Sequence, residues 1–184
     1  MSKKVLVILA DGFEEIEAIT PVDVLRRAGL EVTLAGLSGR VITGAHGIKF
    51  QADMTLDEYK DSPDAIVLPG GMPGAKNLGE SKKVTEIVKR MNSQKKIVGA
   101  ICAAPALALA PAGVLDGKKA TCYPGFEQNF PASVSFSNER VVVDGNIITS
   151  RGPGSALEFA LELVEQLAGK EKAKALTEGL LAKN

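Results

Sequence analysis

The sequence predicts a single α/β domain, with a mostly parallel sheet covered by helices on both faces. Short apolar runs typical of strands alternate along the chain with longer amphipathic patterns typical of helices, which is the order found in parallel sheets. The first run, Lys4 to Leu9, is apolar after its first residue, as expected for a strand buried on both faces. No repeat or linker divides the 184 residues, so one domain is assigned to 1–184.

The N-terminal part is predicted to place one helix and a small hairpin around two strands. Apolar residues of the helix repeat on one face, and Gly29 ends it. Gly44 and Gly47 mark the turn of the hairpin. The expected elements are a strand at Lys4–Leu9, a helix at Glu15–Ala28, a strand at Glu31–Ala35, and hairpin strands at Val41–Thr43 and Ile48–Gln51.

The remainder continues the alternation. Ser81 is the predicted N-cap of a helix, and Asp144-Gly145 is a typical hairpin turn. The stretch 119–138 is ambiguous between short strands and loops. The expected elements are strands at Asp64–Leu68 and Ile97–Ile101, a helix at Ser81–Asn92, a short helix at Ala103–Ala110, hairpin strands at Val141–Asp144 and Asn146–Ser150, and helices at Ser155–Leu167 and Lys170–Ala182.

Composition argues against several classes of function. Lys and Arg number 22, as do Asp and Glu, so no net charge favours nucleic acid or an anionic membrane. No apolar stretch reaches the roughly 20 residues of a membrane helix, and we expect a cytoplasmic protein. Its two cysteines lack the spacing of a zinc site, so we expect free thiols, no metal and no cofactor.

Three predicted strands end in unusual residues. Asp11-Gly12 follows the first strand, Gly70-Gly71 follows the strand ending at Leu68, and Cys102 follows Ile101 directly. In an open α/β sheet, ligands bind beyond the carboxyl ends of the strands. Because these ends should meet at one edge of the sheet, the sequence predicts a functional site there.

Cys102 has the surroundings of a nucleophile. A residue between a buried strand and a helix sits on a sharp turn, as in a nucleophile elbow, although the GxSxG motif is absent. The N-terminus of the following helix would favour the thiolate. The alternative is that Cys102 is a buried packing residue, as free cysteines often are. Cys122 is assigned a structural role.

Two further features could assist this thiol. Acidic residues in a first helical turn are usually solvated, but Glu17 falls on the side of the apolar positions, where burial would raise its pKa and let it share a proton with the thiol. Gly70-Gly71 is either a tight turn or a donor of backbone N–H to an oxyanion, with Ala103 as the second donor. His46, the only histidine, is expected to be exposed.

Five motifs together resemble the ThiJ/PfpI superfamily, in its DJ-one-like branch. The resemblance spans essentially the whole chain, and the motifs occur in the family's order. They are the segments 14–17 (EEIE), 21–29 (PVDVLRRAG), 68–71 (LPGG), 100–105 (AICAAP) and 150–154 (SRGPG).

The resemblance implies a flavodoxin-like three-layer sandwich and a homodimer. It implies that Cys102 is the nucleophile and Glu17 its protonated partner. The oxyanion-type donors would be Gly71 and Ala103. Asp23 matches an aspartate that reaches the site from the partner subunit in the family.

Two departures from the family pattern bear on activity. PfpI-type peptidases carry a histidine directly after the cysteine, and here that residue is Ala103, which argues against proteolysis. Relatives of the DJ-one-like branch often have a histidine before a proline near the site. Tyr123 stands in that place, before Pro124, and its pKa near 10 makes it a poor base at neutral pH.

These features lead to two hypotheses. The first is a cofactor-free, glyoxalase-like or deglycase-like enzyme, in which Cys102 attacks small aldehydes such as methylglyoxal or processes their adducts with protein or nucleotide amines. The second is a non-catalytic sensor of oxidative stress, which works through oxidation of Cys102.

Overall fold

The computed structural model describes residues 2–182 and places seven strands in one twisted sheet. All neighbouring strands are parallel except the β10–β11 hairpin at one edge. This confirms the predicted mostly parallel sheet. In spatial order the strands are β10 (Val141–Asp144), β11 (Ile147–Ser150), β7 (Ile97–Ile101), β6 (Ala65–Leu68), β1 (Lys4–Leu9), β2 (Glu31–Gly36) and β5 (Met54–Thr55).

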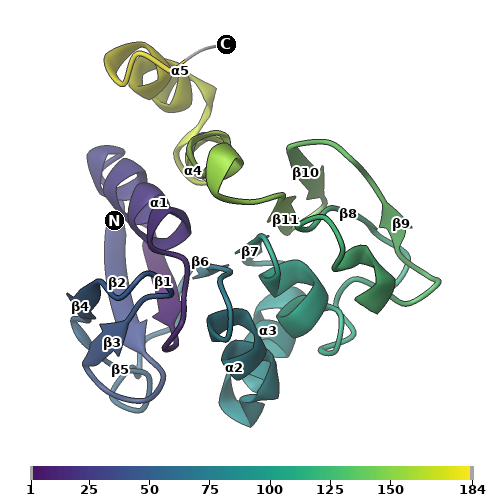
Figure 1. Cartoon of the computed structure of the whole chain (residues 1–184). Helices are drawn as coiled ribbons and strands as arrows, with labels where there is room; N and C mark the ends of the chain where they lie inside the picture. The colour runs from purple at the N-terminus through teal and green to yellow at the C-terminus, as the bar shows by residue number, and fades with distance from the viewer. Residues whose placement is uncertain (1, 183–184) are drawn as a thin grey trace.

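Helices cover both faces of the sheet, so the flavodoxin-like three-layer fold is confirmed (Figure 1). α1 and α4 lie side by side on one face, and α2 and α3 lie on the other (Figure 1). The α-helices are α1 (Glu15–Arg27), α2 (Gly74–Glu80), α3 (Lys82–Ser93), α4 (Ala156–Ala168) and α5 (Lys170–Gly179).

The core explains why β1 is apolar along its length. β1 pairs with β2 on one side and β6 on the other, and Val5 to Leu9 are each at most 1% exposed. A central strand with helices on both faces has no side that water reaches, so both sets of alternating side chains are apolar. Phe13 and Phe159 are likewise fully buried.

Two small sheets lie outside the main one. β3 (Val41–Thr43) and β4 (Lys49–Gln51) form the antiparallel hairpin that the sequence predicted. In the stretch that was ambiguous, β8 (Lys119–Ala120) and β9 (Ser135–Phe136) pair in parallel, with a 3₁₀ turn at Glu127–Asn129 between them.

The structure corrects the expected helix at Ala103–Ala110. The regular segment is a π-helical turn at Pro105–Leu109, in which the Ala110 N–H donates to the Pro105 carbonyl at 3.0 Å. This bond spans five residues, the π-helical pattern, instead of the four residues of an α-helix. Helix α2 and strand β5 were not predicted, because both are short and carry little hydrophobic periodicity.

The predicted N-cap of α3 is confirmed, and its removal should be measurable. The Ser81 hydroxyl accepts a hydrogen bond from the Val84 N–H at 3.3 Å. Ser81→Ala leaves that N–H without its cap, and we expect the free energy of unfolding to fall by about 1 kcal/mol in urea denaturation. Ser93→Ala, at the exposed end of the same helix, is the matched control. Equal midpoints for the two variants would contradict the capping role.

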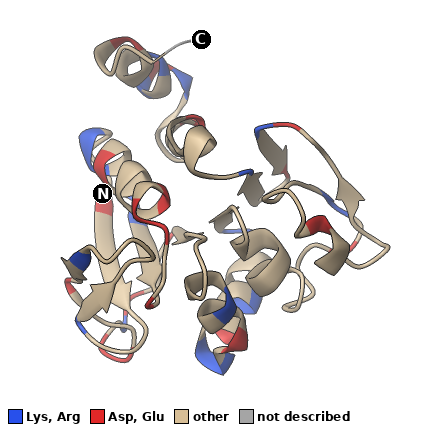
Figure 2. Cartoon of the chain, viewed as in Figure 1, with Lys and Arg blue, Asp and Glu red and all other residues tan. Residues whose placement is uncertain are grey.

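The helices within residues 2–182 include no candidate membrane span. Within residues 2–182, each helix is too short or too polar to cross a bilayer. Positive and negative residues are interspersed over the elements, without one large region of a single sign (Figure 2). This distribution agrees with the balanced composition.

Candidate active site

Cys102 lies on the sharp turn that follows β7. Its φ is +65°, in the left-handed region that non-glycine residues rarely adopt. The turn is held on both sides, because the Cys102 N–H donates to the Ser150 carbonyl at 2.9 Å and its own carbonyl accepts from the Tyr123 N–H at 2.8 Å. The residue is 8% exposed. The elbow expected from the sequence is therefore present, with a strained backbone of the kind found at functional sites.

Glu17 projects from the first turn of α1 into the same place. It is fully buried, and its Oε2 accepts a hydrogen bond from the Gly70 N–H at 2.9 Å. Its Oε1 has no hydrogen-bond partner among residues 2–182. Burial raises the pKa of Glu17 to about 7, against the lowering effect of the Cys102 thiol and the Gly70 N–H; the charge of Glu14 raises it further.

The thiol and the carboxyl act as one pair. Burial raises the pKa of Cys102 to about 12, and the charge of Glu17 adds to the rise, while the backbone N–H groups of Gly71 and Ala103 lower it. This corrects the expectation of a thiolate favoured by a helix N-terminus, since only a short π-helical turn follows and burial outweighs its effect. Near neutral pH the pair therefore holds at least one proton.

Two glycines after β6 make room for this pair. A Cβ on Gly70 would lie 2.5 Å from the Cys102 Cβ and 2.6 Å from Glu17 Oε2, so any side chain there would push the two apart. Gly71 has a φ of +85° and packs against the backbone of Gly12 and Glu14. The three strand ends therefore converge as predicted.

Ala103 and Tyr123 flank the cysteine. Ala103 is buried, and its N–H acts on the Cys102 sulfur together with that of Gly71. Tyr123 is 44% exposed, and its ring packs edge-on against Phe126 at 6.4 Å between centroids. Tyr123 is thus tied to Cys102 through the backbone, and its side chain lines a hollow of about 180 Å³.

His46 and Glu15 form a contact that the sequence did not suggest. His46 is exposed as expected, but its Nδ1 lies 2.9 Å from Glu15 Oε2 and 3.4 Å from a Glu14 carboxylate oxygen. Glu15, expected to be solvated, is 6% exposed, and it also accepts from the His46 N–H at 2.9 Å. These three residues offer ligand atoms within 4.8 Å of one another, the set best placed to hold a cation among the described residues. His46 lies 31 residues from Glu15 in the sequence, so spacing could not reveal this contact.

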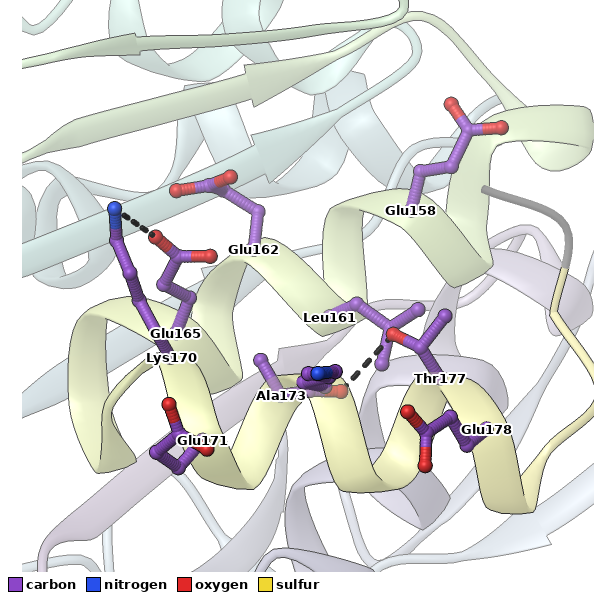
Figure 3. A pocket seen from close by; sticks show the side chains of 10 residues that line it. Glu158, Leu161, Glu162, Glu165, Lys170, Glu171, Ala173, Thr177 and Glu178 are labelled. Atoms are coloured by element: carbon purple, nitrogen blue, oxygen red, sulfur yellow. Dashed lines mark hydrogen bonds and ion pairs between the residues drawn. The ribbon is translucent and has the colours of Figure 1, made fainter.

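A hollow of about 550 Å³ between α4 and α5 lies away from Cys102. Carboxylates dominate its wall, and Lys170 pairs with Glu165 at 3.7 Å (Figure 3). Neither Cys102 nor Glu17 lines it. A smaller hollow of about 180 Å³ is bordered by Tyr123 and Gly152, and a Cβ on Gly152 would lie 3.9 Å from Glu17 Oε1.

Comparison with known proteins places this geometry in a family. The model of the DJ-1/PfpI family matches residues 3–166. The chain is 48% identical over 174 residues to Protein DJ-1 homolog B of Arabidopsis thaliana, covering 94% of this chain but only 40% of that protein. It is 41% identical over 167 residues to a deglycase of Pyrococcus abyssi, covering 89% of this chain and 99% of that protein.

A solved structure agrees with the sequence matches. The crystal structure of Drosophila melanogaster DJ-1beta superposes with a TM-score of 0.96 at 45% identity, over the full length of both chains. The family match covers most of the chain, and the fold and motif order are those expected from the resemblance. The chain therefore belongs to the DJ-1/PfpI family.

Proposed function

We propose that the protein is a cysteine-dependent, cofactor-free enzyme that acts on reactive aldehydes such as methylglyoxal, or on their adducts with protein or nucleotide amines. The observation that carries the proposal is the pairing of Cys102, on a strained turn, with the buried carboxyl of Glu17. A relative of similar length from Pyrococcus abyssi is named a deglycase. The two free cysteines suit a reducing compartment, and we place the protein in the cytoplasm.

The reaction begins with attack of the Cys102 sulfur on the aldehyde carbon, while Glu17 takes the thiol proton. The carbonyl oxygen becomes an oxyanion, which the N–H groups of Gly71 and Ala103 stabilise before it is protonated to a hemithioacetal. The pKa of Glu17, about 7, suits a group that both accepts and returns protons near neutral pH.

Glu17 then moves a proton between the two adjacent carbons of the bound methylglyoxal. It removes the hydrogen of the former aldehyde carbon, an enediol forms, and the proton returns to the neighbouring carbon. The product on the enzyme is a thioester of lactate. Water hydrolyses the carbon–sulfur bond, which releases lactate and restores the thiol. No electrons enter or leave, and one water is consumed.

The test is conversion of methylglyoxal by purified, reduced protein without added thiol or metal. We expect lactate to accumulate over many turnovers, and we expect one equivalent of iodoacetamide on Cys102 to stop it. Loss of methylglyoxal without lactate would indicate simple trapping by surface amines. Absence of turnover at a freely alkylated Cys102 would contradict the enzyme proposal.

A redox sensor is the second candidate, favoured by Tyr123 at a position where a histidine base often stands in relatives. Oxidised sulfur would be an anion facing the N–H groups of Gly71 and Ala103, and a protonated Glu17 could donate to it. Peroxide should then add two oxygens to Cys102, visible in the intact mass. The sensor is favoured over the enzyme if this oxidation is selective and methylglyoxal is not turned over.

We also propose that the chain forms a homodimer through α1. Ile16 on α1 is 52% exposed and Ile48, beside the hairpin, is 53% exposed, which leaves apolar surface for a second copy to cover. Asp23 on the same helix, which pairs with Arg27 at 2.8 Å, would lie near the partner subunit. Light scattering at micromolar concentration should give twice the monomer mass for the wild type and the monomer mass for Ile16→Glu.

A further inference from the structure

The hollow of about 180 Å³ beside the candidate active site has a positive wall that the proposed chemistry does not use. We propose that it is a subsite for the anionic group, carboxylate or phosphate, of the substrate whose carbonyl reaches Cys102. This inference rests on the proposed function and extends it to a class of substrate. The hollow is lined by Tyr123, Pro124, Arg140, Arg151, Gly152, Pro153, Gly154 and Ser155.

Arg151 supplies the positive charge. One of its terminal nitrogens donates to the Asn138 side chain at 2.7 Å and to the Asn138 carbonyl at 3.3 Å. Both acceptors are neutral, and no carboxylate within residues 2–182 lies at ion-pair distance from Arg151. The guanidinium is thus oriented while its charge stays uncompensated.

The second arginine of the hollow, Arg140, forms an ion pair with a carboxylate of the protein. Arg140 donates through Nε to both carboxylate oxygens of Glu158, at 2.7 and 2.9 Å, and to the Gly154 carbonyl. Its charge is neutralised by the carboxylate of Glu158. The net charge that the hollow presents therefore comes from Arg151.

The main chain connects this hollow to the reacting groups. Arg151 directly follows Ser150, whose carbonyl accepts the Cys102 N–H at 2.9 Å. Gly152 comes next, and a Cβ on it would lie 3.0 Å from the Tyr123 ring and 3.9 Å from Glu17 Oε1. The hollow therefore comes close to the buried carboxyl at Gly152, where the Tyr123 ring lies beside the path.

Glu17 Oε1 is the second observation that points to a ligand. This oxygen is completely buried, has no partner within residues 2–182 and lies on the Gly152 side of the carboxyl. Buried polar atoms without partners are uncommon in folded proteins. A substrate that spans from the hollow to Cys102 would pass this atom and could supply its missing hydrogen bond.

The donor chemistry selects the ligand class. An arginine guanidinium offers a planar fork of N–H groups that matches carboxylate and phosphate oxygens. Methylglyoxal is neutral and would leave this charge unused. A 2-oxoaldehyde with a carboxylate, or an aldehyde adduct on a phosphate-bearing molecule, would engage both Arg151 and Cys102.

The first test needs no enzymatic activity. Iodoacetate and iodoacetamide alkylate the same thiol but differ in charge, so the ratio of their rates at Cys102 reports the local potential. In Arg151→Gln we expect the iodoacetate-to-iodoacetamide ratio to fall about 3- to 10-fold, with Arg151→Lys retaining part of it. Arg90→Gln, exposed on α3, is the matched control. A ratio equal in wild type and Arg151→Gln would overturn the subsite.

The second test measures specificity. 4,5-Dioxopentanoate resembles methylglyoxal with a carboxylate on its tail, and the same reaction would convert it to 2-hydroxyglutarate. We expect its kcat/KM, relative to that of methylglyoxal, to fall about tenfold in Arg151→Gln, which corresponds to the loss of one charged hydrogen-bonded contact. An unchanged relative value would contradict the subsite even where turnover persists.

Competition distinguishes the two anions. Inorganic phosphate should slow alkylation of wild-type Cys102 by iodoacetate more than acetate does if the natural group is a phosphate, and the reverse order indicates a carboxylate. Failure of both anions to compete would speak against the subsite. If neither aldehyde is turned over but the iodoacetate-to-iodoacetamide ratio still falls in Arg151→Gln, the enzyme proposal is rejected and the anion site is retained.

Discussion

Cys102→Ala is expected to lower kcat/KM for methylglyoxal by at least about 10³-fold, because it removes the atom that bonds to the aldehyde. The fold should survive. Alanine is smaller than cysteine, the residue is nearly buried, and the two backbone hydrogen bonds of the turn do not involve the side chain. The check is lactate formation, together with a thermal unfolding midpoint close to that of the wild type.

Cys122→Ala is the matched control for this prediction. Cys122 is also a free thiol, but it is fully buried, and burial raises its pKa to about 12. We expect Cys122→Ala to retain turnover within about twofold and to lose about 1 kcal/mol of stability through the small cavity it leaves. Comparable loss of activity in the two variants would mean that the Cys102 thiol is not the nucleophile.

Glu17→Gln is expected to lower kcat/KM for methylglyoxal by about 10²- to 10⁴-fold, the range typical of a lost general acid–base group. Glutamine can still accept the Gly70 N–H at the position of Oε2, so the hydrogen bond between α1 and the turn after β6 is kept. The activity of the wild type should rise with pH through about 7 as Glu17 ionises, and this dependence should vanish in the variant. A pH–rate profile of unchanged shape would exclude Glu17 as the base.

The same substitution should change how stability depends on pH. Burial raises the pKa of Glu17 from an ordinary value of 4.5 to about 7, so between these values the folded state binds more protons than the unfolded one. Stability from this group therefore falls as pH rises from 4.5 to 7, by about 3 kcal/mol in total. In Glu17→Gln, the free energy of unfolding should no longer show this decrease between pH 4.5 and 7.

The comparison requires a second glutamine variant. Glu86→Gln removes one exposed carboxyl on α3 and should follow the wild-type pH dependence. The readout is the change in the free energy of unfolding between pH 4.5 and pH 8. This difference is used because the unpaired amide of the buried glutamine can lower the stability of Glu17→Gln equally at every pH. Parallel curves for wild type and Glu17→Gln would show that the pKa of Glu17 is the same in the folded and unfolded states, so that burial does not raise it.

The sequence by itself determined the layer architecture and the location of the site. Strands that are apolar on both faces, such as Lys4–Leu9, alternate with amphipathic helices, and that pattern has few solutions other than a covered parallel sheet. The unusual residues after three strands then had to meet, because parallel strands share an edge. The residues Gly70, Gly71, Cys102 and Ala103 could be assigned to that edge for the same reason.

Only the tertiary structure decided how each acidic or basic group is buried and paired. The sequence already set Glu17 apart from Glu14 and Glu15, but only the structure shows that Glu17 is fully buried against Gly70 and Cys102, while Glu15 pairs with His46 across 31 residues. Likewise, two arginines share one hollow, but Glu158 neutralises Arg140 and not Arg151. Periodicity reports which face of an element is apolar, a local property. Desolvation and ion pairing depend on which distant segments pack together, and these set the charge and the pKa of each group.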